Sequence, residues 1–98
     1  MYLGCYIDTD DRAVPGNVYS APDNTHNKCF QHCRSHNQRY AAVQNGQDCW
    51  CGGIGVAYDK HGQTPEAECN VACTGDASET CGAVYRNSVF DLLGKYFI

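Results

Sequence analysis

The chain has 98 residues, a formal net charge of -4 and eight cysteines. This length fits a single domain, and the seven Lys and Arg residues form no basic run, which argues against nucleic-acid binding. No apolar stretch is long enough to span a bilayer, so we expect no membrane insertion. An even number of cysteines at this density is typical of secreted domains whose small cores need disulfides.

The first predicted element is a strand over residues 2–8, which is rich in strand-forming Tyr and Ile and has Gly4 as a bulge. Residues 9–24 are predicted to be a loop. The turn signals Pro15-Gly16-Asn17 and Ala21-Pro22-Asp23-Asn24 both lie within it.

A helix is predicted over residues 26–37, with Thr25 as its N-cap and Asn37 as its C-cap. Cys29 and Cys33 are four residues apart and therefore lie on one face of this helix.

Two strands, over residues 39–44 and 47–52, are predicted to flank Asn45-Gly46, which is a strong hairpin signal. Cys49 and Cys51 are two residues apart in the second of these strands. Both cysteines therefore point to one face of the sheet, and the residue between them points to the other.

The spacing of these cysteines lets the helix dock on the strand through two bridges. One helical turn rises about 6 Å, and two strand residues span about 6.6 Å. Because these two distances are similar, two disulfides can form side by side. They are either Cys29–Cys49 with Cys33–Cys51, or the crossed pairs Cys29–Cys51 with Cys33–Cys49.

Residues 52–68 are predicted to be a loop with little regular structure, residues 69–82 a turn-rich segment and residues 84–92 a last strand. A disulfide Cys73–Cys81 would close a short turn within the turn-rich segment 69–82. The remaining cysteines, Cys5 and Cys69, would then join the first strand to the start of that segment.

The chain ends in an apolar segment over residues 93–98. An exposed apolar patch usually marks an interface. The segment therefore motivates an alternative function, a structural module that self-associates or packs in a cell-surface or fibre assembly. Its apolar residues, together with the one before it, are Leu92, Leu93, Tyr96, Phe97 and Ile98.

Three groups of residues together resemble the WSC domain family over residues 2–92. The first is Tyr2-Leu3-Gly4-Cys5-Tyr6-x-Asp8, then Arg12 and Thr25-x-x-x-Cys29-x-x-x-Cys33. The second is Tyr40-Ala41-Ala42-Val43-Gln44 with Cys49-Trp50-Cys51-Gly52. The third is Cys69-Asn70-x-x-Cys73-x-Gly75-Asp76 with Cys81-Gly82, Arg86 and Val89.

This resemblance implies an extracellular α+β module in which an antiparallel sheet cradles one helix, similar to the PAN/apple arrangement. WSC domains are regarded as carbohydrate-binding modules, and any enzymatic activity of their parent proteins lies elsewhere in the chain. Residues 93–98 extend past the usual end of the family, and residues 53–68 follow no fixed family pattern. The family pairing is Cys5–Cys69, Cys29–Cys49, Cys33–Cys51 and Cys73–Cys81.

Aromatic side chains are the main ligand candidates, because the CH groups of a sugar pack well on an aromatic ring. Trp50 faces away from the bridges, where it either stacks on a sugar or is covered by loop 52–68 as a second small core. Tyr19 and Tyr58 are candidates because they fall in predicted loops, whereas Tyr6, Tyr40 and Tyr85 are expected to pack in the sheet. The hydrogen-bonding neighbours would be Asn45, Gln47 and Asp59.

Polar residues suggest neither a metal site nor catalysis. Asp8, Asp10, Asp11 and Arg12 lack the pattern of a calcium loop and are expected to form a solvated turn with a local ion pair. Thiols near a histidine pair would suit zinc only if reduced, and we expect them to be oxidised. The pair and its neighbouring thiols are His32, His36, Cys29 and Cys33.

Loop glutamates provide no evident acid–base pair, so we expect a non-enzymatic module without cofactor or metal. These glutamates are Glu66, Glu68 and Glu79. The sequence thus predicts an extracellular or cell-surface domain that binds cell-wall or matrix polysaccharide. The first residues do not resemble a signal peptide, which would have been removed or lie upstream.

Overall fold

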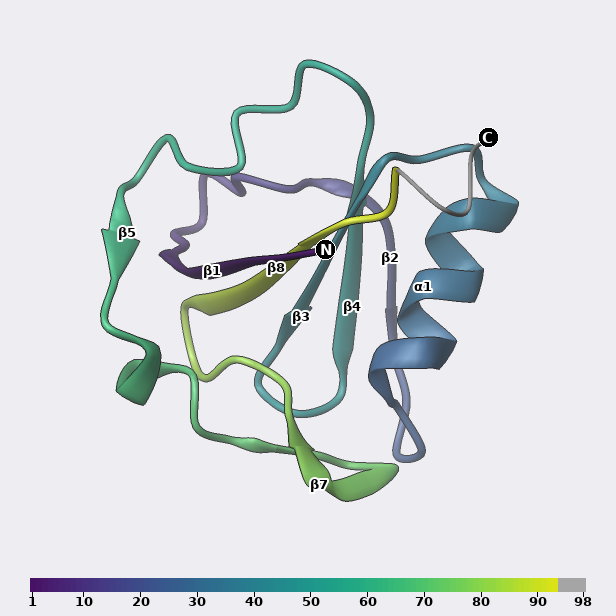
Figure 1. The fold of residues 1–98 in the computed structure, drawn as a ribbon, viewed down its shortest axis with the longest axis vertical. Helices are drawn as coiled ribbons and strands as arrows, with labels where there is room; N and C mark the ends of the chain where they lie inside the picture. The colour runs from purple at the N-terminus through teal and green to yellow at the C-terminus, as the bar shows by residue number, and fades with distance from the viewer. Residues whose placement is uncertain (94–98) are drawn as a thin grey trace.

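The computed structural model describes residues 1–93, in which one α-helix packs on a six-stranded antiparallel sheet (Figure 1). The strand order in the sheet is β2-β4-β3-β8-β1-β5, and a second sheet contains β6 and β7. The predicted α+β architecture is confirmed. The elements are β1 (Tyr2–Ile7), β2 (Gly16–Ser20), α1 (His26–Ser35), β3 (Tyr40–Gln44), β4 (Asp48–Gly52), β5 (Gln63–Thr64), the 3-10 helix η1 (Glu66–Glu68), β6 (Ala72–Cys73), β7 (Asp76–Thr80) and β8 (Arg86–Asp91).

Helix α1 begins where the sequence predicts and ends earlier. The Thr25 hydroxyl accepts a hydrogen bond from the backbone N–H of Lys28 at 3.1 Å, so Thr25 is the N-cap. The C-cap is His36 and not the predicted Asn37. Asn37 follows with φ 58°, the left-handed conformation that commonly ends a helix, and asparagine tolerates it.

The Asn45-Gly46 hairpin is confirmed, because both residues have positive φ values, 53° and 80°, between β3 and β4. The bulge expected at Gly4 is also present, since the β1–β8 register shifts between Tyr2 and Gly4. These features depend on local backbone preferences, which explains why the sequence predicts them.

The prediction of a loop over residues 9–24 is wrong at β2. This strand pairs with β4 at the edge of the sheet, with Tyr19 opposite Cys49. Its register shifts between Gly16 and Tyr19. An edge strand tolerates Pro, Gly and Asn near its start. The same residues are also typical of turns, so the sequence pattern predicts a loop where the strand begins.

The second half of the chain contains more strand pairing than expected. The loop predicted over residues 52–68 includes β5 and η1, and the turn-rich segment 69–82 includes the β6–β7 pair. The last strand begins at Arg86, two residues later than predicted, because Tyr85 lies in a tight turn closed by an Ala83–Arg86 bridge.

The four disulfides are those implied by the family resemblance, and every cysteine is bonded. Helix α1 is joined to strand β4 by Cys29–Cys49 and Cys33–Cys51, so the bridges are uncrossed, a choice that the cysteine spacing alone left open. The bridges are Cys5–Cys69, Cys29–Cys49, Cys33–Cys51 and Cys73–Cys81.

The sheet separates two cores, one on each face. We call the side covered by α1 the helix face, and its core contains Ala41, Val43 and the bridges between α1 and β4. The other side, the loop face, is covered by residues from the loops after β1 and β4. Its core contains Tyr6, Ala13, Val14, Ala42 and Val89, with Leu3, Trp50 and Tyr58 packed against it.

Within residues 1–93, no helix is long and apolar enough to cross a membrane. Of the predicted apolar extension 93–98, only Leu93 belongs to the described part, where it is exposed. Tyr96, Phe97 and Ile98 lie outside the described residues. Leu92, predicted to belong to the same patch, is instead buried in the core of the helix face.

Candidate functional site

The loop face carries a stack of one cation between two aromatic rings. The guanidinium carbon of Arg12 lies 4.8 Å from the centroid of the Trp50 ring and 5.3 Å from that of Tyr85. Cation–π attraction favours this arrangement. Trp50 is half-buried against the loop-face core, and the side chain that lies over its ring is Arg12.

A buried carboxylate holds Arg12 in this position. Asp8 is 3% exposed, and it accepts hydrogen bonds from Arg12 Nη1 at 3.0 Å, Gln44 Nε2 at 2.9 Å and the Ala13 N–H at 3.0 Å. Gln44 also donates to Asn87 Oδ1 at 2.7 Å. The predicted ion pair is present, but the prediction of a solvated turn is wrong for Asp8, because the turn folds inward onto the sheet.

The charge of Asp8 is stabilised by these donors. Burial alone raises the pKa of Asp8, but the hydrogen bonds from Ala13, Gln44 and Arg12 outweigh burial and hold the pKa below its ordinary value. The carboxylate is therefore ionised at neutral pH, and it fixes the orientation of the guanidinium above Trp50.

Beside this stack lies an open hollow of about 410 Å³, lined by Asp8, Thr9, Asp10 and Tyr85. The Tyr85 hydroxyl donates to Asp10 Oδ1 at 2.5 Å, and this bond raises the pKa of Tyr85. Tyr85 is 39% exposed. The hollow thus combines an accessible aromatic ring with the exposed carboxylate of Asp10 and the hydroxyl groups of Thr9 and Tyr85, whereas the carboxylate of Asp8 is buried.

The backbone of Tyr85 is strained, with φ at 53°. Positive φ is uncommon for a bulky side chain, whereas the other non-glycine residues with positive φ in residues 1–93 are asparagines, which tolerate it. Strained residues concentrate at functional sites. The sequence prediction placed Tyr85 in the sheet, and the only local signal against that is the turn-forming Gly82 upstream.

Trp50 and Tyr58, two of the predicted ligand residues, pack against the same loop-face core. The ring of Tyr58 lies 5.3 Å from that of Tyr6 and 5.2 Å from that of Tyr40. Asp59 follows it and is exposed. The loop face therefore carries several aromatic residues in addition to those of the Arg12 stack.

The other predicted ligand residues lie away from this group. Tyr19 is on the helix face, where its hydroxyl donates to Asn24 Oδ1 at 2.6 Å and its ring lies 4.8 Å from that of His32. Asn45 and Gln47 are exposed in the turn between β3 and β4. The structure thus divides the six predicted residues among three locations.

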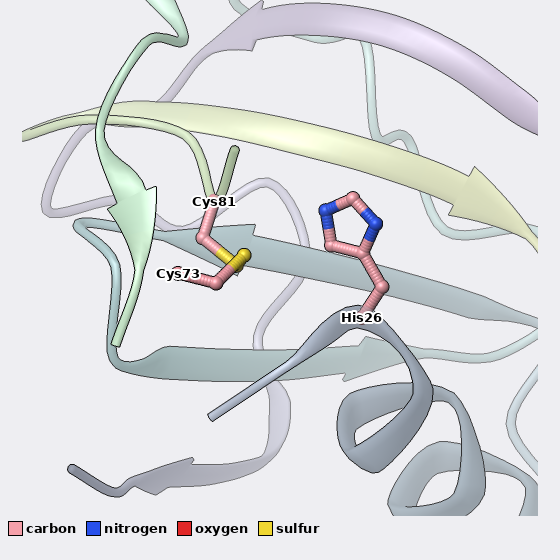
Figure 2. A group of neighbouring side chains, drawn as sticks. All are labelled: His26, Cys73 and Cys81. Carbon is pink, nitrogen blue, oxygen red and sulfur yellow. A yellow bond between two sulfur atoms is a disulfide. The ribbon is translucent and has the colours of Figure 1, made fainter. Parts of the chain in front are cut away.

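Two groups of side chains have the proximity of metal ligands. In one, the ligand atoms of His26, Cys73 and Cys81 lie within 4.8 Å of one another, and Figure 2 shows His26 beside the disulfide. The other group is Cys29, Cys33 and Cys49. All these sulfurs are in disulfides, so they are not the thiolates that zinc binds.

The loop glutamates contact neighbouring groups within the domain. Glu66 accepts from the Tyr2 hydroxyl at 2.6 Å, Glu68 from Arg86 Nε at 2.7 Å, and Glu79 from the backbone N–H of His26 at 3.0 Å. The first two contacts link the 3-10 helix η1 to the main sheet, and the third links β7 to α1, so Glu79 lies in a strand and not in the predicted loop.

The disulfide framework and the helix-on-sheet topology define a class of small modules with oxidised cysteines. The WSC domain model matches residues 2–83, and the chain belongs to the WSC domain family. Disulfide-rich domains of this class are typical of extracellular or luminal proteins.

Several curated proteins contain a similar segment. The chain is 35% identical over 94 residues to Xylosyltransferase oxt of Drosophila melanogaster, covering 91% of this chain and 10% of that protein. It is 34% identical over 92 residues to Kremen protein 1 of Homo sapiens, covering 93% and 19%. A WSC domain-containing protein of Arthroderma benhamiae is 34% identical over 88 residues, covering 89% and 12%. The chain thus spans a small part of each relative.

Proposed function

We propose that this domain is a non-catalytic extracellular or cell-surface module that binds uncharged polysaccharide of a cell wall or matrix. The observation that carries the proposal is the hollow beside Tyr85. An exposed ring offers a stacking surface, and the exposed carboxylate of Asp10 can accept hydrogen bonds from sugar hydroxyl groups.

Charge favours an uncharged glycan over an acidic one. Asp8 and Asp10 line the hollow, and the chain has a net charge of -4. The cation in contact with Asp8, Arg12, is already paired with it. Sulfated or uronic acid polymers would therefore meet like charge.

The ligand surface would extend from Tyr85 across Arg12 to Trp50, with Tyr58 and Asp59 as outer contacts. Tyr19, on the helix face, and Asn45 and Gln47, in the turn between β3 and β4, would lie outside this surface. Single sites of this open kind bind weakly, and repetition of the domain would increase avidity.

The test is retention of the oxidised domain on a panel of insoluble neutral and acidic polysaccharides. We expect retention on a neutral polymer, loss in Tyr85→Ala and reduction in Trp50→Ala. Val84→Ala is the matched control, because Val84 is 64% exposed in the same turn. Retention that Tyr85→Ala leaves unchanged would contradict this site, and no retention on any polymer would contradict the function.

The alternative, a self-associating module, rests on the apolar extension 93–98. Deletion of these residues tests it. A fall in molecular mass by light scattering, with glycan retention unchanged, would support a separate assembly role. A monomer with and without the extension would contradict it.

A further inference from the structure

A second hollow lies on the helix face, beside the N-terminal end of α1. Its volume is about 220 Å³, and it is separated by the sheet from the stack of Arg12 and Trp50. No part of the proposed glycan site belongs to it. The residues that line it are Tyr2, His26, Glu66, Thr80, Ser88 and Phe90.

Aromatic rings form the apolar wall of this hollow. The centroid of the Phe90 ring lies 4.8 Å from that of Tyr2 and 4.9 Å from that of His26. The rings are tilted by 47° and 55° to one another. His26 projects from the start of α1 toward the strands (Figure 2). Because the rings are tilted, they give the hollow an apolar wall against which an alkyl chain can pack, and they do not form one flat platform for a sugar.

The polar end of the hollow is a carboxylate without a cationic partner. Within residues 1–93, Glu66 forms no ion pair, and its hydrogen-bond donor is the Tyr2 hydroxyl at 2.6 Å. Burial and the contact with Glu66 raise the pKa of Tyr2, so the phenol stays neutral. The nearby Glu68, in contrast, is neutralised by Arg86 at 2.7 Å.

The positive end of the helix does not offset this negative charge. The backbone N–H of His26 donates to Glu79 Oε1 at 3.0 Å, so a second carboxylate already covers the helix N-terminus. The His26 ring places Nε2 at 2.6 Å from the Thr80 carbonyl oxygen. The hollow therefore favours a cation.

We propose that this hollow binds the ammonium group of a lysine side chain presented by a protein partner. The aliphatic part of the lysine would pack against Tyr2 and Phe90, whose ring faces also attract the cation. The ammonium would donate to Glu66, a charge-assisted hydrogen bond. This gives the domain a protein-binding face opposite its glycan face.

The test is a titration of the isotope-labelled oxidised domain with Nα-acetyl-lysine methylamide at neutral pH, followed by amide chemical shifts. We expect saturable shifts at Tyr2, Glu66 and Phe90. The Nε-acetylated analogue, which lacks the charge, should give none. Shifts that are equal for the two compounds, or absent for both, would overturn the proposal, and so would stronger binding of glucosamine than of the lysine derivative.

Variants locate the interaction. Glu66→Gln should weaken binding about tenfold by removing the charge. Glu68→Gln is the matched control on the same 3-10 helix and should leave the affinity unchanged. Phe90→Leu, which keeps an apolar side chain and removes the ring, should weaken binding as well. Equal affinities for all three variants and the unmodified domain would overturn the site.

Discussion

The two faces of the sheet are held together in different ways. On the helix face, Cys29, Cys33, Cys49 and Cys51 are all 0% exposed, so covalent bonds tie α1 to β4 within the core. The loop face has no such bridge in its core and depends on packing and on the hydrogen bonds of Asp8. The helix face is therefore sensitive to reduction, and the loop face is sensitive to pH and to single side chains.

Removing one of the two bridges between α1 and β4 should lower stability more than any of the single-residue changes on the loop face. Loop-closure entropy predicts that Cys33→Ala with Cys51→Ala, a separation of 18 residues, lowers the free energy of unfolding by about 3 kcal/mol. The melting temperature should fall by more than about 12 °C, measured by circular dichroism.

The shorter Cys73–Cys81 bridge, with a separation of 8 residues, is the comparison for this prediction. Its removal should lower the free energy of unfolding by about 2.5 kcal/mol in the same model. A double variant at Cys33 and Cys51 that melts at the temperature of the intact domain would show that the covalent links do not distinguish the faces.

Asp8→Asn should produce the next largest effect, because it removes the charge that Arg12 and the Ala13 N–H contact in a buried position. We expect the free energy of unfolding to fall by about 2 kcal/mol, measured by urea denaturation at neutral pH. The exposed Asp59→Asn variant should change it by less than about 0.5 kcal/mol. Equal values for the two variants would mean that the Asp8 network does not hold the loop face.

Acid should weaken the loop face through the same residue. Because the pKa of Asp8 is lower in the folded state, the unfolded state binds more protons as the pH falls. The stabilisation by Asp8 is complete above its unfolded pKa, about 3.9, and is lost as the pH falls through its folded pKa. Urea midpoints measured across this range should fall less in Asp8→Asn than in the unmodified domain. Parallel pH profiles would contradict this assignment.

Tyr85 should give the smallest change in stability and a large change in binding. Tyr85→Gly relieves the positive φ and Tyr85→Ala does not, so the glycine variant should melt at the higher temperature, by less than about 4 °C. Both variants should lose retention on polysaccharide. An alanine variant as stable as the glycine variant would show that the backbone at Tyr85 is not strained.

Local signals account for the parts of the fold that the sequence predicts. Thr25 caps α1, and Asn45-Gly46 forms the turn of the hairpin. The alternation of side chains along β4 places Trp50 on one face of the sheet and Cys49 and Cys51 on the other. Each of these features depends on a few neighbouring residues. The sequence does not predict strand β2, because its pairing with β4 involves residues about thirty positions away, whereas its own residues are typical of turns.

The candidate site was only partly predictable for the same reason. The residue types of Trp50 and Tyr58 suit a sugar, and both lie on the loop face. The sequence predicts an ion pair in a turn for Arg12 and packing in the sheet for Tyr85. No sequence pattern indicates that residues 12, 50 and 85 meet in one stack, since they come from three separate segments.

The sequence by itself determined the class of protein, because eight cysteines at family spacing, one capped helix and one hairpin are local features. The tertiary structure decided which carboxylate is buried and which aromatic ring is exposed. Asp8 is ionised in a buried position only because Arg12, Ala13 and Gln44 donate to it together. That environment exists only after distant segments have packed on the same sheet.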